Sequence, residues 1–169
     1  ELAVAAVITR GVITLALLTL AFLVYRHWIL TRLRTIRAPA DLDAPPADAL
    51  EVQGVRARVL EPPTEPEVDP PGPRDVVTVH YTGWSRETGQ MFDSSVTREQ
   101  PAAFRLDQVI EGWRLGLMQM RPGERRRLWI PARLAYGTRP GEAGPAGALV
   151  FDVELLSIGR VPDGGQEEE

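Results

Sequence analysis

Residues 76–82 read VVTVHYT, and a similar pattern returns near the end of the chain, where residues 149–156 read LVFDVELL. In both stretches large apolar side chains occupy every second position, beginning at Val77 and Leu149. Alternation with a period of two is typical of a β-strand that has one buried face. Both stretches are therefore predicted to be strands whose odd-numbered residues face a core.

The segment between these two strands contains further regular elements. Leu128 and Ile130 continue the alternation after a turn signal at Pro122-Gly123. Residues 109, 110, 113 and 117 are apolar and have helical spacing, so one short helix should present Trp113 to the strands. Several antiparallel strands around a single helix predict an α+β fold.

Charged residues in these strands are expected to face water. Asp152 and Glu154 occupy the even-numbered positions of their strand, which are predicted to lie on its outer face. The run Arg125-Arg126-Arg127 is interpreted as a solvated edge or face, because charge runs usually are.

An uncharged apolar run, GVITLALLTLAFLVY, covers residues 11–25. Together with the apolar residues before Arg10 it is long enough to cross a bilayer, which needs about 20 residues. A signal peptide or a buried helix of a soluble domain are the alternatives, but most of the basic residues follow the run and the run has no polar face. Residues 1–37 are therefore predicted to be a membrane anchor with a basic flank, and the trailing arginines place the rest of the chain on the cytoplasmic side.

Residues 38–73 hold nine of the 15 prolines and are acidic. Proline favours extended backbone, so this region is predicted to be a stiff, exposed linker with one possible strand at residues 55–60. The folded domain is assigned to residues 74–160. Residues 161–169, with two glycines and three glutamates, are predicted to be a disordered acidic tail.

The composition excludes several kinds of chemistry. There is no cysteine, and the two histidines, His27 and His80, lie in different regions, so neither a histidine-based triad nor a metal cluster is expected. No part of the predicted domain is basic enough to bind nucleic acid. All 19 basic residues are arginine, which is typical of a G+C-rich genome and indicates a bacterial source.

The predicted domain is rich in aromatic residues that lie near glycines. All of them could belong to a core, which is the ordinary place for such side chains. Gly112 and Gly116, however, fall inside the predicted helix, where each glycine costs about 1 kcal/mol relative to alanine. They are expected only where another group approaches the helix closely.

Seven short segments, in this order, resemble FKBP-type peptidyl-prolyl cis-trans isomerases. They are residues 79–83 (VHYTG), 91–95 (MFDSS), 109–113 (VIEGW), 123–124 (GE), 130–131 (IP), 134–137 (LAYG) and 149–155 (LVFDVEL). The resemblance covers residues 76–158. It implies an FKBP-like fold, in which a curled five- to six-stranded antiparallel sheet surrounds one short helix and an apolar pocket lies between them.

The resemblance also implies roles for particular residues. Trp113 would form the pocket floor, and the Ile110 backbone N–H and the Tyr136 hydroxyl would hydrogen-bond the bound prolyl peptide. Asp93 would lie at the rim with Tyr81 and Arg98. The walls, and the further residues implied in substrate binding, are Tyr81, Phe92, Val109, Ile110, Phe151, Phe104 and Ala102.

The implied activity is rotation of X–Pro peptide bonds in proline-containing polypeptides, which would assist protein folding and needs no cofactor or metal. The alternative is a non-catalytic module that binds prolyl segments as a chaperone. Two departures affect the rim: Ala102 stands where many members carry a phenylalanine, and residues 137–148 lack bulky aliphatic side chains. A flat preference among X–Pro peptides and weak binding of macrolide inhibitors are therefore expected.

Overall fold

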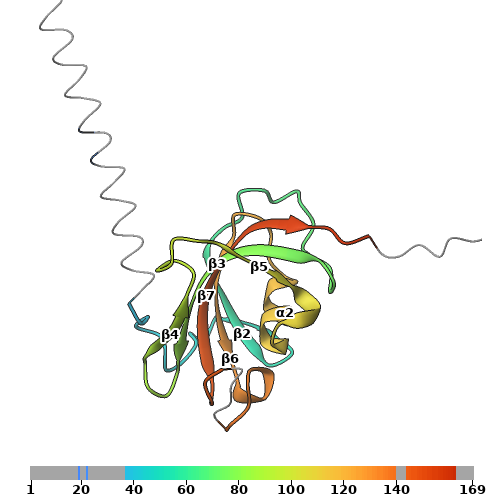
Figure 1. The fold of residues 1–169 in the computed structure, drawn as a ribbon. Helices are drawn as coiled ribbons and strands as arrows, with labels where there is room; N and C mark the ends of the chain where they lie inside the picture. The colour runs from blue at the N-terminus through green and yellow to red at the C-terminus, as the bar shows by residue number, and fades with distance from the viewer. Residues whose placement is uncertain (1–18, 20–21, 23–36, 140–143, 163–169) are drawn as a thin grey trace, which may run out of the picture. The chain divides into compact units, whose positions relative to one another are not determined.

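A computed structural model describes residues 19, 22, 37–139 and 144–162. These residues form a seven-stranded antiparallel sheet with the order β1-β2-β6-β7-β3-β4, in which β5 also pairs with β3 (Figure 1). The strands are β1 (Leu50–Val52), β2 (Val55–Glu61), β3 (Val76–Ser85), β4 (Met91–Ser94), β5 (Ala102–Arg105), β6 (Arg125–Ile130) and β7 (Leu149–Gly159). The α+β class and the curled antiparallel sheet around one short helix are confirmed.

The prediction of five or six strands was wrong, because the described residues form seven. The β1–β2 hairpin lies inside the proline-rich segment and is closed by Gln53 and Gly54, whose φ angles of 49° and 92° are both positive. Such a pair is characteristic of a two-residue turn between twisted strands. β1 has only three residues, which is too short for an alternating pattern to be recognised in the sequence.

The inner face of the sheet carries the main core. β3 and β7 pair from Val76 to Ser85, and both strands bury side chains along nearly their whole length. The helix α2 (Glu111–Leu117) packs against this face (Figure 1). A Cβ atom on Gly112 would lie 2.3 Å from Ile130, and one on Gly116 would lie 2.6 Å from Leu128. The group that was expected to approach the helix glycines is therefore β6.

The helix begins later than the sequence pattern predicted. Val109 and Ile110 were expected within it, but Ile110 has extended backbone and is the residue before the first turn. The Ile110 carbonyl accepts hydrogen bonds from the amides of Trp113 and Arg114, at 2.9 and 3.1 Å. Ile110 therefore turns the chain from the 3-10 helix η1 (Leu106–Gln108) into α2.

The outer face of the sheet is also covered. Trp84, Trp129 and Val150 form a second apolar cluster with Leu42, which comes from the proline-rich segment. The Trp129 indole N–H donates to the Asp41 carbonyl oxygen at 3.0 Å. Part of the segment predicted to be an exposed spacer is therefore packed onto the domain.

Two expectations for the charged residues of β6 and β7 were wrong. Asp152 is 2% exposed, and it accepts hydrogen bonds from Arg127 at 2.6 and 2.9 Å and from Arg125 at 3.3 Å. Arg126 is 7% exposed and pairs with the buried Glu124. Asp41 and Leu42 cover the outer face, where Arg127 and Asp152 pair with each other. Arg126 instead lies on the core face with Leu128, where it also donates to the Gln119 carbonyl oxygen at 2.9 Å.

The chain ends lie largely outside the described residues. None of the helices in the described part is long and apolar enough to span a bilayer, and the predicted anchor at residues 1–37 falls almost wholly outside that part. Of the predicted tail, the Val161 amide donates to the Asp75 carboxylate at 2.9 Å, and residues 163–169 are not described.

Candidate functional site

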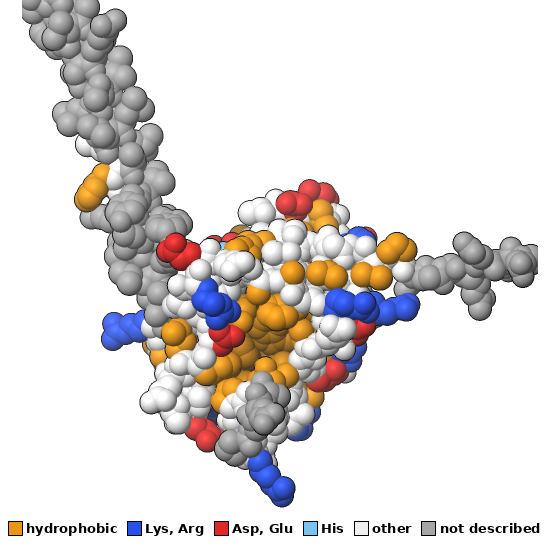
Figure 2. Space-filling model, viewed as in Figure 1, with side chains coloured by type: hydrophobic (Ala, Val, Ile, Leu, Met, Phe, Trp, Pro, Cys, Tyr) orange, Lys and Arg blue, Asp and Glu red, His pale blue; other side chains and the backbone are white. Residues whose placement is uncertain are grey.

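A cavity of about 350 Å³ opens on the inner face of the sheet, between the sheet and α2. Figure 2 shows it as a hollow with an apolar floor and charged side chains at parts of its rim. The residues that line it are Tyr81, Phe92, Asp93, Phe104, Gln108, Val109, Ile110, Trp113, Tyr136 and Phe151.

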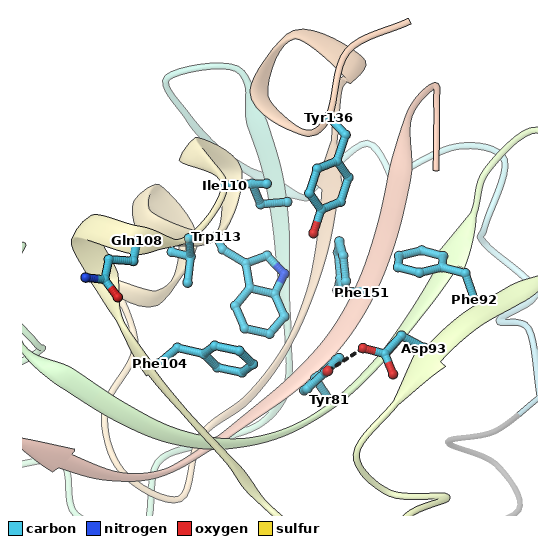
Figure 3. A pocket seen from close by; sticks show the side chains of 10 residues that line it. Tyr81, Phe92, Asp93, Phe104, Gln108, Ile110, Trp113, Tyr136 and Phe151 are labelled. Atoms are coloured by element: carbon cyan, nitrogen blue, oxygen red, sulfur yellow. Dashed lines mark hydrogen bonds between the residues drawn. The ribbon is translucent and has the colours of Figure 1, made fainter. Parts of the chain in front are cut away.

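Trp113 forms the centre of the floor and is only 5% exposed. Its ring meets three others edge to face: the centroid of Tyr81 is 5.1 Å away, and those of Phe104 and Phe151 are each 5.3 Å away (Figure 3). Phe92 meets Phe151 in the same way at 5.6 Å. Edge-to-face pairs are a favourable arrangement of aromatic rings, and these contacts fix the indole on three sides.

The sheet brings these rings together from strands that are distant in sequence. Tyr81 comes from β3, Phe104 from β5 and Phe151 from β7. Gly83 makes the arrangement possible, because a Cβ atom there would lie 2.6 Å from Phe151 and 2.7 Å from Phe92. Any larger residue at this position would displace one of the two rings.

The polar part of the rim is a network of three side chains. The Tyr81 hydroxyl and an Arg98 Nη atom both donate to the Asp93 carboxylate, and Arg98 also donates to the Tyr81 hydroxyl oxygen at 3.1 Å. Burial acts to raise the pKa of Asp93, but the two hydrogen bonds and the guanidinium charge outweigh it and hold the pKa below its usual 3.8. Asp93 is therefore a carboxylate at neutral pH.

Both tyrosines of the pocket keep their protons at neutral pH. Burial and the hydrogen bond to Asp93 raise the pKa of Tyr81 above its usual 10.0. Burial and the nearby negative charge of Asp93 also raise the pKa of Tyr136. The Tyr136 hydroxyl points into the cavity and makes no hydrogen bond to another lining residue (Figure 3). It is a donor with room for an acceptor in front of it.

The structure brings together nine of the residues that the sequence assigned to the site. They are Tyr81, Phe92, Asp93, Phe104, Val109, Ile110, Trp113, Tyr136 and Phe151. Two others do not line the cavity: Arg98 contacts it through Asp93 and Tyr81, and Ala102 packs half-buried against the core.

Gln108 lines the cavity but was not predicted. It ends η1 as an exposed polar residue, and nothing in the local pattern distinguishes it from a loop residue. Among the described residues no group of three or more side chains is arranged to hold a metal ion.

The chain is similar to known proteins over this region. Residues 68–156 match the family model described as FKBP-type peptidyl-prolyl cis-trans isomerase. Over 90 residues, 51% of this chain, the sequence is 51% identical to the peptidyl-prolyl cis-trans isomerase FPR2 of Saccharomyces cerevisiae, of which it covers 67%. It is 49% identical over 89 residues to the FKBP-type isomerase FkpA of Aeromonas hydrophila.

A solved structure has the same fold. The crystal structure of FkpA from Escherichia coli superposes with a TM-score of 0.60 at 36% sequence identity over 68% of this chain. The chain spans 54% of that structure and 33% of the Aeromonas protein, so both contain regions with no counterpart in the match.

Proposed function

The chain belongs to the family of FKBP-type peptidyl-prolyl cis-trans isomerases, and we propose that it rotates X–Pro bonds of substrate polypeptides in the cavity above Trp113. The observation that carries this assignment is the convergence of three rings on the Trp113 indole, which gives a rigid apolar floor beneath an open cavity.

An apolar cavity can accelerate this rotation without an acid, a base or a metal. The barrier of about 18–20 kcal/mol arises because the twisted amide loses its resonance. The planar amide is more dipolar than the twisted one, and water stabilises the planar form more. Removing water from the prolyl bond therefore lowers the barrier, and a cavity that fits the twisted form better than the planar one lowers it further.

The polar groups at the rim would orient the peptide. The Tyr136 hydroxyl and the Ile110 amide lie beside the cavity, and each can donate to a carbonyl oxygen of the bound chain. Asp93 is held by Tyr81 and Arg98, so its charge is partly neutralised before a peptide enters. These residues would fix which way the peptide lies while the bond turns.

The substrates that fit this site are proline-containing polypeptides, and the proposed role is to assist their folding. Large macrolide inhibitors should bind weakly, because Ala102 offers little wall beside Phe104. The described residues present no basic surface in this cavity, and nucleic acid is not a proposed partner.

We also propose that residues 1–37 tether the domain to a membrane with the isomerase on the cytoplasmic side. Support comes from the apolar run at residues 11–25 and from the arginines that follow it. The chain should then sediment with membranes, and protease added to sealed spheroplasts should leave the domain intact. Recovery of the full chain in the soluble fraction would contradict the tether, and digestion in spheroplasts would reverse the orientation.

The proposed site is tested by following the indole and amide signals of the isotopically labelled chain in NMR spectra while a short X–Pro peptide is added. Signals from Trp113 and Ile110 should shift most. An alanine peptide of the same length is the control and should shift neither signal at the same concentration. Binding that leaves Trp113 unchanged would show that the prolyl ring rests elsewhere.

A further inference from the structure

A second cavity, of about 250 Å³, lies at the end of the sheet near the β1–β2 turn. We refer to it as the Arg86 pocket. It is lined by Pro45, Gly54, Arg56, Arg86, Trp129, Ile130, Pro131, Ala132, Ala148 and Leu149. None of these residues lines the cavity above Trp113, and the only charged side chains among them are the two arginines.

Both arginines are held by backbone carbonyl groups of the proline-rich segment. The Arg86 Nε atom donates to the Asp43 carbonyl oxygen at 2.8 Å, and an Arg56 Nη atom donates to the Pro46 carbonyl oxygen at 3.4 Å. Carbonyl groups orient a guanidinium but do not neutralise its charge. The pocket therefore contains two positive charges, one on the exposed Arg86 and one on the partly buried Arg56.

The acidic residues near the pocket are exposed: Glu87 lies beside Gly147, next to the lining residue Ala148, and Asp43 supplies the carbonyl group that holds Arg86. Glu51 reaches Arg56 only at 3.5 Å and is 61% exposed, so water screens this pair. The Arg56 Nε atom is buried and has no hydrogen-bond partner among the described residues. A buried N–H group without an acceptor is uncommon in a folded protein and indicates that a ligand could supply one.

A third guanidinium lies at the same edge. Gly54 has a positive φ, and a Cβ atom there would lie 2.2 Å from an Arg133 Nη atom. Arg133 thus rests on the glycine that lines the pocket, and a side chain at position 54 would push it away. The remaining lining is mostly apolar and includes Pro45, Pro131 and the buried Trp129.

We propose that the Arg86 pocket binds an acidic side chain of a polypeptide, together with an apolar neighbour of that residue. Arginine binds carboxylates through charge-assisted hydrogen bonds, often two at once, and the apolar walls favour a ligand with an apolar part over a simple ion. The choice of a polypeptide as the source of the carboxylate rests on the proposed function. The pocket would then hold an acidic segment of a client chain apart from its prolyl bond.

The test uses the full chain labelled with nitrogen-15 and two blocked peptides without proline, acetyl-Leu-Glu-Leu-amide and acetyl-Leu-Gln-Leu-amide. The Trp129 indole signal detects binding in the Arg86 pocket, and the Trp113 indole signal detects binding in the cavity proposed for the prolyl ring. The glutamate peptide should shift the Trp129 signal, leave the Trp113 signal in place, and bind about tenfold more tightly than the glutamine peptide.

Arg86→Gln should weaken binding of the glutamate peptide about tenfold, whereas Arg114→Gln, which removes the same charge from the surface of α2, should not. Equal binding of the two peptides, an unmoved Trp129 signal, or acetate binding as tightly as the peptide would overturn the proposal. The proposed function is tested separately, by the shift of the Trp113 signal when an X–Pro peptide is added. A negative result at Trp129 would therefore leave the proposed function standing.

Discussion

The indole ring of Trp113 meets the ring of Phe151 edge to face, with centroids 5.3 Å apart and planes at 80° to each other. Trp113 lies on α2 and Phe151 on β7, so the contact joins the helix to the centre of the sheet. A floor built across two elements cannot shift without disturbing the core. This rigidity is what a site needs if it is to fit a twisted amide better than a planar one.

Catalytic efficiency should not change with pH between about 5 and 9. Asp93 has a pKa below 3.8, so it stays ionised as the pH falls to 5, and Tyr81 and Tyr136 have pKa values above 10.0, so they stay protonated as the pH rises to 9. The measurement is kcat/KM for one X–Pro peptide across this range. A change of kcat/KM with pH inside this range would mean that another ionisable group controls catalysis.

Asp152→Ala should lower the free energy of unfolding by about 3–5 kcal/mol. The substitution leaves Arg127 and Arg125, which are 13% and 14% exposed, without the buried carboxylate that they share. Urea denaturation measures the effect. Glu111→Ala, which removes one partner of an exposed pair on α2, is the control and should leave the midpoint within error. Equal effects of the two changes would contradict the burial of the Asp152 network.

Leu42→Ala should lower the free energy of unfolding by about 2–5 kcal/mol, because Leu42 fills the outer cluster beside Trp84. Leu50→Ala is the matched control: Leu50 is 57% exposed, so its truncation should change stability by no more than about 0.5 kcal/mol. If both variants unfold at the urea concentration of the parent chain, the proline-rich segment is a spacer after all.

The strands could be predicted from local alternation, and most of the pocket residues from the resemblance to a known family. Alternation marked β3 and β7, and the segments around Tyr81 and Trp113 have the spacing of a known family. The outer face could not be predicted. Arg127 lies opposite Asp152 in the β6–β7 ladder, and Asp41 and Leu42 cover that face. The alternation in β7 indicates neither the strand register nor this cover.

Two features of the rim of the cavity above Trp113 could not be predicted from the sequence either. Gln108 ends η1, just before the chain enters α2, and there its side chain lines the cavity. An exposed polar residue in the sequence gives no indication of such a position. Ala102 was assigned by position, yet in the structure it lies against the core while Phe104 provides the wall. Residues 140–143, which belong to the rim segment 137–148, lie outside the described residues.

Selectivity among X–Pro peptides should be flat. Full burial of an apolar side chain contributes about 1.5–3 kcal/mol, and a thin rim recovers only part of that. Peptides with leucine, phenylalanine, alanine or glutamate before proline should therefore differ by less than about tenfold in kcat/KM. A preference of about a hundredfold for leucine over glutamate, about 2.7 kcal/mol, would mean that the rim encloses the residue before proline after all.

Ala102→Phe should increase the preference for leucine over glutamate. Residues 102 and 104 are two apart on β5, so their side chains point to the same face, and a phenylalanine at 102 would extend the wall that Phe104 begins. The mirror change on the other face, Ala103→Phe, should leave the preference as it was. An unchanged ratio in Ala102→Phe would remove position 102 from the substrate site.

The rate of cis–trans exchange in a short X–Pro peptide, measured by NMR with the full chain and with Trp113→Leu, tests the central claim most directly. The full chain should raise the exchange rate in proportion to its concentration, above an uncatalysed process that takes tens to hundreds of seconds. Trp113→Leu should remain folded and lose at least about tenfold in kcat/KM, about 1.4 kcal/mol of transition-state stabilisation. Trp84→Leu, on the outer face, should lower stability but keep this efficiency below its unfolding temperature. A folded chain that binds the peptide without accelerating its exchange, or a Trp113→Leu variant as active as the parent, would contradict the claim.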